Sequence, residues 1–396
     1  MNLPLGYRFS GVHCGLKSNA SLPDLSLIVS DTPASAAGVF TPNLVCGAPV
    51  LVDRNRLPGT GFRGVVGNSR CANACTGEQG IKDAEEMSAL ASQAAGGEPD
   101  KGLVISTGVI GTMLPMDKIR SGIKTAAAAL EATEAAFLNA ARGIMTTDTV
   151  EKYAVRNLQL EDGTEIRLAG ICKGAAMIAP HLATMLAVVF TDAFVEPETA
   201  QHLISGAAEM SFNCITIDGH TSTSDTLLFL ANGRADAKPL AAKNLERFAK
   251  VLQDICIELA VKIPADGEGA SHLITVDVQG CKHRDDAKKI ARKISEDALV
   301  KTAICGADPN WGRIVSASGT AGVPYNPKGV LLQINGITLF ENGEPVPFDK
   351  AEVSHSIRSN RDTHIVLQLS EGEESVRFWT TDLTAEYVRL NSDYTT

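Results

Sequence analysis

The sequence predicts a mixed α/β or α+β protein with stacked layers of helices and strands. Short apolar runs rich in Val and Ile, typical of strands, alternate along the chain with segments whose apolar residues recur at spacings of three and four, typical of helices. The chain has 396 residues, of which 44% are hydrophobic. Because this length is long for a single core, we expect two or three substructures. The ordinary apolar fraction argues against a disordered, collagen-like or coiled-coil chain.

The expected strands are the short apolar runs, and the expected helices are the longer periodic segments. Strands are expected at residues 25–30, 49–52, 64–67, 103–106, 185–191, 274–278, 330–334, 365–369 and 376–380. Helices are expected at 81–95, 116–145 (interrupted), 197–210, 240–262 and 284–298. Residues 126–141 include nine alanines, and we interpret them as helix rather than low complexity because Ala is the best helix former. A change from strand to charged helix near Gly280 suggests a core at 1–280 and a smaller C-terminal α/β domain at 281–396.

Charge and hydropathy exclude several function classes. The 36 Lys and Arg against 46 Asp and Glu give a net charge of -10, which repels phosphate backbones, so no nucleic-acid partner is expected. The basic segment 282–293 is interleaved with aspartates and is interpreted as a solvated helix face, with a phosphate-binding patch as the alternative. The apolar run 185–190 is far shorter than the ~20 residues that span a bilayer, and residues 1–10 do not resemble a secretory signal. We therefore expect a cytoplasmic protein without a membrane partner.

The nine cysteines, an odd number, do not form a recognisable metal or disulfide pattern. The one close pair is Cys71 and Cys75, which could be a redox or metal pair but which we interpret as small side chains of the core. No metal or organic cofactor is expected.

The familiar nucleotide and hydrolase motifs do not explain this chain. Residues 59–64 match GxGxxG, but they precede a strand, whereas a dinucleotide loop follows a strand and opens a helix, so they are interpreted as a loop without a cofactor. No GxxxxGK[ST] occurs, and no HExxH, GxSxG or SxxK surrounds a plausible nucleophile.

The most informative segment is KGAAMIAPHLATMLAVVF at residues 173–190. Small residues and Pro180 lead to Ala183, and Thr184 then opens an apolar strand. Small residues allow a close backbone approach, and proline keeps the approach irregular. Judged by pattern alone, this is a loop that enters a core strand.

The segment resembles the self-cleavage site KGxxMIAPxxATMLA of the ornithine acetyltransferase (glutamate N-acetyltransferase) family of arginine biosynthesis. Further similarities follow in the family's order over about 390 residues. They are GYRFSGVHCGLK near the N-terminus, ISTGVIG at 105–111, IMTTDT at 144–149, DGxTSTSDT at 218–226, ADGEGA at 265–270, DPNWGR at 308–313 and EYVRLNSDYTT at 386–396. The resemblance implies a layered sandwich similar to N-terminal-nucleophile enzymes and the related aminopeptidases, with a smaller C-terminal domain.

The resemblance implies that the chain cuts itself between Ala183 and Thr184, giving an α chain of residues 1–183 and a β chain of 184–396. Thr184 then becomes the catalytic nucleophile. A threonine hydroxyl needs a base at neutral pH, and a free α-amine, with a reference pKa of about 7.7–8.0, lies on the same residue. Before cleavage that nitrogen is an amide and is not basic, so processing creates the base.

The resemblance also assigns the other site residues. Thr107 and Gly108 correspond to the oxyanion hole, where loss of one donor costs about 3–4 kcal/mol; without the resemblance STG would be a turn that ends a strand. Lys173 corresponds to the lysine that binds a substrate carboxylate. Without the resemblance it would be interpreted as a solvated lysine in a loop. The remaining substrate-binding positions are Thr146, Thr147, Glu268, Asn391 and Thr396, together with Thr184 itself. Asn391 and Thr396 lie close to the C-terminus, so their assignment implies that this end of the chain is ordered instead of frayed.

Five positions depart from the family pattern near the motifs. Ala175 and Ala176 replace a usual Ser-Gly or Gly-Gly, and Ala176 loses backbone freedom if that site needs a positive φ. His181 replaces Asn or Asp, and His220 replaces Asp. Ser224 likewise replaces a usual Asn. These changes bear on the rate of self-cleavage, and His181 could carry a proton during it.

The implied reaction transfers an acetyl group from N2-acetyl-L-ornithine to L-glutamate in a ping-pong scheme through acetylated Thr184. The family implies that both fragments stay associated in an α2β2 assembly. Whether acetyl-CoA also serves as a donor is left open by the sequence. Two alternatives remain: an N-terminal-nucleophile aminopeptidase or amidase that passes the acyl group to water, and a non-enzymatic scaffold that stays uncut.

Overall fold

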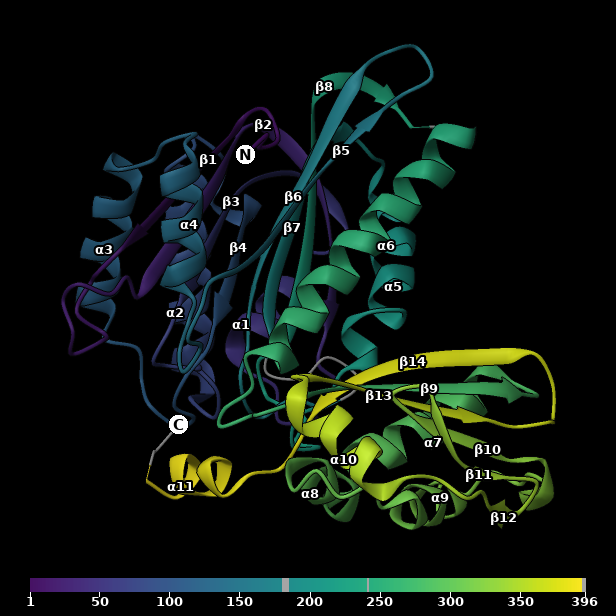
Figure 1. Cartoon of the computed structure of the whole chain (residues 1–396). Coiled ribbons are helices and arrows are strands. Elements are labelled where there is room, and N and C mark those ends of the chain that lie inside the picture. The colour runs from purple at the N-terminus through teal and green to yellow at the C-terminus, as the bar shows by residue number, and fades with distance from the viewer. Residues whose placement is uncertain (180–184, 241, 394–396) are drawn as a thin grey trace. The chain divides into compact units, whose positions relative to one another are not determined.

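The computed structural model describes residues 1–179, 185–240 and 242–393, without the side chains of residues 237 and 242. Two units divide the chain (Figure 1). The first comprises residues 1–213 and 221–263, and the second comprises residues 214–220 and the chain from 264 onward. The second unit thus begins well before residue 280, because the strand at Leu273–Cys281 pairs with strands that follow it in the chain.

The described strands of unit 1 form one eight-stranded sheet. Its order is β4-β3-β2-β8-β7-β6-β5, with β1 paired to β2. The strands are β1 (Tyr7–Val12), β2 (Leu25–Phe40), β3 (Gly59–Asn68), β4 (Gly102–Ser106), β5 (Lys152–Gln159), β6 (Glu165–Lys173), β7 (Leu186–Phe194) and β8 (Thr226–Pro239). The β3–β4 and β7–β8 pairs are parallel, and the other neighbours are antiparallel.

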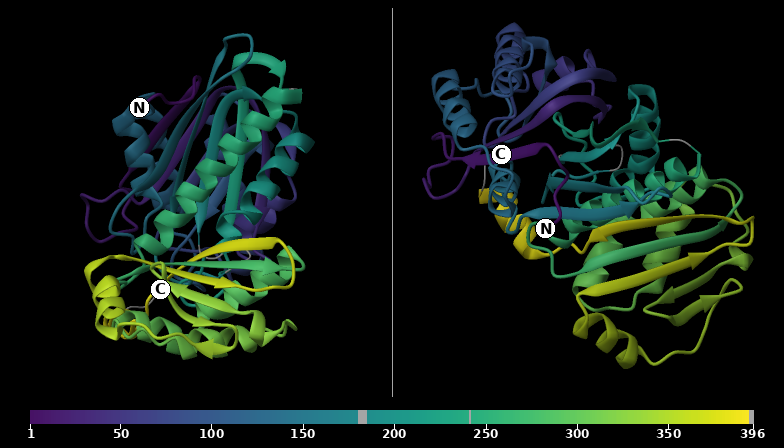
Figure 2. Two further views of the ribbon diagram at one scale, coloured as in Figure 1. Left: turned by 45° about the vertical axis from the view of Figure 1, so that its right-hand side comes forward. Right: turned by 90° about the horizontal axis from the view of Figure 1, so that it is seen from above.

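Helices cover both faces of this sheet (Figures 1 and 2). Alternation along β2 places Ile28 in a core with α4 and the aromatic residues Phe9, Phe137 and Phe190, whereas Leu27 and its neighbours face a core with α1, α2 and α3. The helices are α1 (Ala48–Arg54), α2 (Gly77–Gln93), α3 (Met116–Ala128), α4 (Glu134–Gly143), α5 (Pro197–Glu209) and α6 (Ala242–Ala265).

Unit 2 contains a six-stranded sheet among the residues described, in the order β12-β11-β10-β13-β9-β14. Ile274, Val276 and Val278 of β9 are buried, and the apolar face of α7 packs on β9 and β14. The strands are β9 (Leu273–Cys281), β10 (Leu331–Ile334), β11 (Ile337–Glu341), β12 (Glu344–Pro345), β13 (Asp362–Gln368) and β14 (Glu374–Thr381). The helices are α7 (Arg284–Glu296), α8 (Ala298–Cys305), α9 (Trp311–Gly319), α10 (Lys350–Ser359) and α11 (Ala385–Asp393).

The mixed, layered α/β class is confirmed, and so are the five expected helices, the 116–145 segment being interrupted between α3 and α4. Two local interpretations are wrong. Residues 49–52, expected as a strand, lie in the helix α1. Pro49 stands in the first turn, where proline is favoured, and the helix buries apolar residues of this short run on one side. Residues 59–64 are not a loop but the first half of β3, which still excludes a phosphate loop at the start of a helix.

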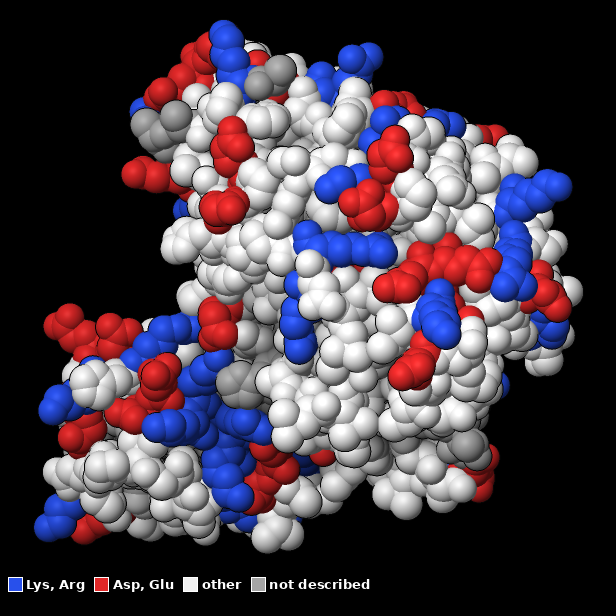
Figure 3. Space-filling view, turned by 180° about the vertical axis from the view of Figure 1, so that it is seen from behind, with Lys and Arg blue, Asp and Glu red and all other residues white. Residues whose placement is uncertain are grey.

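On the face seen in Figure 3 acidic and basic residues are interspersed, with a local gathering of basic ones at the lower left. Helix α7 buries Ala287, Ile290 and Ile294 and exposes Lys289 and Lys293, as expected for a solvated helix face. No helix in the described part of the chain has the length and apolar character needed to cross a membrane.

The two close cysteines lie in different environments. Cys71 is buried, as interpreted, and contacts the carbonyl oxygen of Thr112 at 3.0 Å. Cys75 is exposed, so its interpretation as a core side chain is wrong. Within the described ranges no group of three or more His, Cys, Asp and Glu residues is arranged to hold a metal ion.

Candidate active site

The expected oxyanion residues lie where β4 ends. Parallel pairing places Asn68 of β3 beside Ser106 of β4, and the Ser106 hydroxyl donates to the Asn68 side chain at 2.6 Å. The Thr107 N–H donates to the Asn68 carbonyl oxygen at 3.1 Å, and Thr107 is buried. The end of the strand is therefore fixed by a side chain as well as by the sheet.

Gly108 has a conformation and surroundings that only glycine fits. Its φ is +131°, and an added Cβ would lie 2.2 Å from the carbonyl carbon of Arg70. Among the contacts of the described residues, neither the Gly108 N–H nor the Thr107 hydroxyl has a hydrogen-bond partner. Both expected donors are therefore held by a crowded backbone without being used by it.

Lys173, the expected carboxylate-binding residue, is not a solvated loop lysine. It is the last residue of β6, is 2% exposed, and pairs with Leu186 at the start of β7. This register places Lys173 beside the strand that begins two residues after Thr184. Residue 184 itself lies outside the described residues.

The first residues of β7 are also held by β8. The Thr226 N–H donates to the Met185 carbonyl oxygen at 3.1 Å, and the Met185 N–H donates to a carboxylate oxygen of Asp225 at 3.2 Å. Burial raises the pKa of the Asp225 carboxyl well above its usual range, with the nearby Lys173 opposing the effect. Asp225 thus contacts the backbone nitrogen of Met185, the residue that follows Thr184 in the chain.

Thr146 and Thr147 lie in the connection between α4 and β5, next to a buried carboxylate. The Thr146 N–H donates to Asp148 at 3.1 Å, and the Gly174 N–H donates to the other oxygen of Asp148 at 2.7 Å. Lys152 forms an ion pair with Asp148 at 2.6 Å, and both side chains are almost completely buried. Asp148 therefore connects the Thr146–Thr147 segment with the end of β6.

Positive charge surrounds Asp148. Burial by itself raises the pKa of this carboxyl, but Lys152 and Lys173 outweigh that effect and hold the pKa below its usual range. Lys17 is within electrostatic range of Asp148 and of Arg70, the residue against which Gly108 packs, and burial lowers the pKa of Lys17. Lys17, which also interacts with Asp24, is therefore an electrostatic neighbour of both Asp148 and Arg70.

The departures from the family pattern near residue 175 fall at tolerant positions. Positive φ angles occur at Gly174 (+155°) and Met177 (+57°), and not at Ala175 or Ala176. The two alanines therefore meet no backbone restriction of the kind expected for Ala176. His181 lies outside the described residues, as do Ala183 and Thr396.

The expected residues of unit 2 meet each other on the surface. The Asn391 side chain of α11 donates to the Glu268 carboxylate at 2.9 Å and to the Tyr387 carbonyl oxygen at 3.0 Å. The Asp218 carboxylate accepts hydrogen bonds from the backbone N–H of His220 at 3.2 Å and from the Tyr387 hydroxyl at 3.1 Å. The described part of the C-terminal segment is therefore a helix in contact with the Glu268 loop of unit 2.

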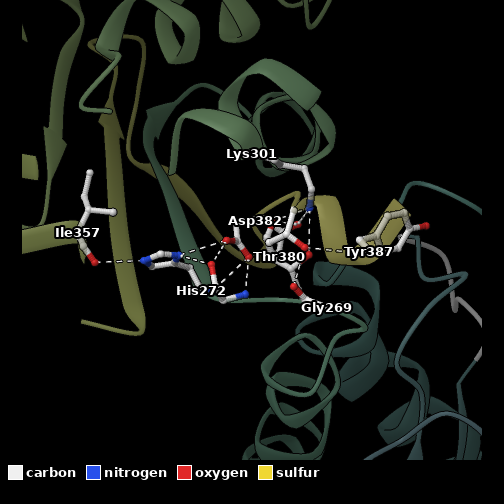
Figure 4. A network of polar contacts seen from close by, with 10 residues as sticks. Gly269, His272, Lys301, Ile357, Thr380, Asp382 and Tyr387 are labelled. Atoms are coloured by element: carbon white, nitrogen blue, oxygen red, sulfur yellow. Dashed lines mark hydrogen bonds and ion pairs between the residues drawn. The ribbon is translucent and has the colours of Figure 1, made fainter. Parts of the chain in front are cut away.

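A polar network holds this segment in place (Figure 4). The Thr384 hydroxyl donates to the Gly269 carbonyl oxygen at 2.7 Å and accepts from the Tyr387 N–H at 3.1 Å. Gly269 has a φ of +65°, and a Cβ there would lie 2.5 Å from the Tyr387 nitrogen. Thr384 and the close approach at Gly269 together fix α11 to the loop that carries Glu268.

Two buried charged residues, Asp382 and Lys301, form further polar contacts in the same network (Figure 4). Asp382 accepts from the N–H groups of Ser271 and His272 at 2.9 and 3.0 Å and contacts the His272 ring at 3.2 Å. Lys301 donates to the Thr380 hydroxyl at 2.9 Å and to the Thr381 carbonyl oxygen, and burial lowers the Lys301 pKa to about 8.

Reasoning from the sequence did not identify Asp148, Lys152 or Asp225. Asp148 and Asp225 stood inside the quoted motifs TTDT and TSTSDT, so buried-acid positions in those motifs were the available signal. Lys152 stands four residues after Asp148, so its nearness in the chain was the available signal for their ion pair.

The chain is similar to known proteins along almost all of its own length and of theirs. The sequence matches the ArgJ family over residues 8–396. It is 43% identical over 397 residues to the arginine biosynthesis bifunctional protein ArgJ of Rhodopirellula baltica, covering 100% of this chain and 96% of that protein. For the protein of the same name from Bacillus cereus the identity is 41%, with 99% and 96% covered.

A solved structure agrees with these relatives. The crystal structure of arginine biosynthesis bifunctional protein ArgJ from Bacillus halodurans is 36% identical, with a TM-score of 0.50. The match covers 51% of this chain and 96% of that one. On the match along residues 8–396 and the identity to full-length relatives, this chain belongs to the ArgJ family.

Proposed function

We propose that this protein is an acyltransferase that moves the acetyl group of N2-acetyl-L-ornithine to L-glutamate in arginine biosynthesis. Membership of a family whose relatives are named for arginine biosynthesis supports the pathway. The observation that carries the chemistry is the pair of unused donors at Thr107 and Gly108, held on a crowded backbone.

Thr184 is the proposed nucleophile, released as an N-terminal residue when the Ala183–Thr184 bond is cut. Its amine takes the proton from its own hydroxyl, which attacks the acetyl carbonyl, and the amine then protonates the departing ornithine nitrogen. The hydrogen bonds of Met185 with Asp225 and Thr226 support a fixed position for the residue that follows the nucleophile. Glutamate next attacks acetyl-Thr184 through its amine and leaves as N-acetylglutamate.

The other residues stabilise charge. The Thr107 hydroxyl and Gly108 N–H stabilise the oxyanion of each tetrahedral intermediate, and Lys173 binds the substrate carboxylate with Thr146 and Thr147. Glu268 is assigned to binding a substrate ammonium or the Thr184 amine, and Asn391 and Thr396 are assigned to lining the substrate pocket. Both substrates are amino-acid derivatives, so one carboxylate anchor serves the two half-reactions.

Self-cleavage has independent support from the solved relative. The Bacillus halodurans chain aligns over 96% of its own length yet covers only 51% of this chain, as a separate fragment does. Cleavage at residue 183 divides the 41.7 kDa chain in the ratio 183 to 213, giving fragments of about 19 and 22 kDa that remain associated. We further propose an α2β2 assembly located in the cytoplasm, without nucleic-acid or membrane partners.

The relatives are named bifunctional, which favours a second activity. We propose acetyl-CoA as an additional donor for acetylglutamate formation, and no other cofactor. Incubation with acetyl-CoA and glutamate, in the absence of acetylornithine, should yield N-acetylglutamate; no product under conditions that support transfer from acetylornithine would refute this second activity.

The test of the main activity measures ornithine release with and without glutamate. Acetyl transfer predicts N-acetylglutamate equal to the ornithine released and little free acetate. Ornithine and acetate in equal amounts, unaffected by glutamate, would indicate an amidase. Absence of both products, with no acetyl group on Thr184, would indicate a non-enzymatic scaffold.

A further inference from the structure

The Asp148 carboxylate is shared by two segments that are far apart in the chain. One oxygen accepts from the Thr146 N–H at 3.1 Å, and the other accepts from the Gly174 N–H at 2.7 Å and from Lys152 at 2.6 Å. Thr146 and Gly174 adjoin the proposed substrate-binding residues Thr147 and Lys173. A single side chain therefore sets the distance between these two segments.

This arrangement depends on burial and charge together. The side chains of Asp148 and Lys152 are 0% and 1% exposed, so a charge left without its partner would be strongly unfavourable. Lys152 is the first residue of β5 and pairs with Cys172, which places its ammonium group beside the end of β6. The β5–β6 hairpin thus brings the cation to a carboxylate that is already bonded to the backbone on both sides.

We propose that Asp148 is a positioning residue for substrate binding, which holds the Thr146–Thr147 segment in register with Lys173 and is itself neutralised by Lys152. The inference rests on the proposed function, because it assigns Thr146, Thr147 and Lys173 to substrate. Contacts with a substrate carboxylate are made equally in the ground and transition states, so misplacing them raises KM and changes kcat little.

The variant Asp148→Asn separates positioning from simple packing. Asparagine has the same shape but one acceptor oxygen, so it retains one of the two backbone hydrogen bonds and removes the ion pair of residue 148 with Lys152. We expect KM to rise about tenfold or more for both acetylornithine and glutamate, with kcat per processed site within about threefold of wild type. Active sites are counted from the acetyl-enzyme formed on mixing with acetylornithine.

The double variant Asp148→Asn with Lys152→Met addresses loss of folding. Replacing both members of a buried ion pair avoids an isolated buried charge, so this protein should fold even where the single variant does not. It should still show the raised KM for both substrates. Lys152→Met alone retains both backbone bonds and should have a KM nearer to wild type than the double variant.

Asp162→Asn is the matched control, because Asp162 is an exposed residue in the turn of the same β5–β6 hairpin. Its KM should equal that of wild type. A folded, processed Asp148→Asn or double variant with wild-type KM for both substrates would overturn the inference. Failure of wild type to transfer acetyl groups would instead refute the proposed function, so the two failures are distinguishable.

Discussion

The two units treat a buried charge in opposite ways. In unit 1 the Asp148 carboxylate lies between Lys152 and Lys173, and its pKa is lowered despite complete burial. In unit 2 Lys301 is held by hydroxyl groups and a carbonyl oxygen, with carboxylates acting only from further away, and burial lowers its pKa to about 8. Burial disfavours both ions, and a full opposite charge in contact decides which one remains favourably ionised.

The difference suggests separate roles for the polar clusters. The cluster of unit 1 holds charge next to the proposed reaction and depends on an exact backbone, as Gly108 shows. The network of unit 2 attaches α11 to the Glu268 loop through the Thr384 hydroxyl and through the hydrogen bond of Asn391 to the Glu268 carboxylate, and α11 has no buried residue of its own. Substitutions in unit 1 should therefore affect catalysis first, whereas those in unit 2 should affect stability and the order of α11.

The largest effect is expected for Gly108→Ala. The new methyl group would meet the Arg70 backbone at 2.2 Å, so the backbone must shift and displace the proposed oxyanion donors. We expect kcat to fall about 10²–10³-fold, the usual consequence of losing one such donor. Steady-state kinetics on processed protein provides the measurement.

Gly111→Ala is the control for backbone strain. Gly111 also has a positive φ, +81°, but no atom lies within 4 Å of an added Cβ. It should lose about 1 kcal/mol of stability and keep its kcat. Equal losses of kcat in both variants would contradict the role of crowding at Gly108.

Lys301→Met should sharpen the contrast in buried charge. Because the Lys301 pKa is lowered from 10.5 to about 8, the unfolded chain binds more protons between those pH values, and the free energy of unfolding contributed by this residue rises with pH there. The shift corresponds to about 3 kcal/mol of disfavoured ionisation below pH 8. Denaturant unfolding from pH 7 to 10 should show this rise in wild type and not in Lys301→Met.

Asp148 should also give a free energy of unfolding that rises with pH, but in the acid range, because its charged form is favoured in the fold whereas that of Lys301 is disfavoured. Because the pKa of Asp148 is lowered in the fold, its ionised carboxylate stabilises the protein at pH values above the ordinary carboxyl pKa. That stability is lost as the pH falls through the lowered pKa of the folded state. A pH profile of wild type that matches Lys301→Met in alkali and Asp148→Asn in acid would mean that the two buried charges do not differ as described.

A smaller effect is expected for Thr384→Val. Valine keeps the shape but removes the bonds to the Gly269 carbonyl and the Tyr387 N–H, which should cost about 1–2 kcal/mol and increase hydrogen exchange along α11. Thr384→Ser keeps the hydroxyl and should behave as wild type. Unchanged exchange in Thr384→Val would show that α11 is held without this residue.

Much of the fold and part of the site could be predicted from the sequence. Periodic segments such as 284–298 gave correct helices because burial on one face imposes that spacing. The short run 49–52 failed, since four apolar residues fit a strand or a buried helix equally well. Long-range contacts were inaccessible: Asp148 meets Gly174 only because β5 and β6 pair, and spacing along the chain does not reveal the partner.

The central claim is that Thr184 is released by self-cleavage and carries the acetyl group. The direct measurement is the intact mass of the purified protein beside Thr184→Ala, before and after mixing with N2-acetyl-L-ornithine. The account predicts fragments of about 19 and 22 kDa from wild type, the heavier beginning at Thr184 and gaining one acetyl group, and a single 41.7 kDa chain from Thr184→Ala. An uncut wild-type chain, or cleavage of both proteins alike, would contradict it.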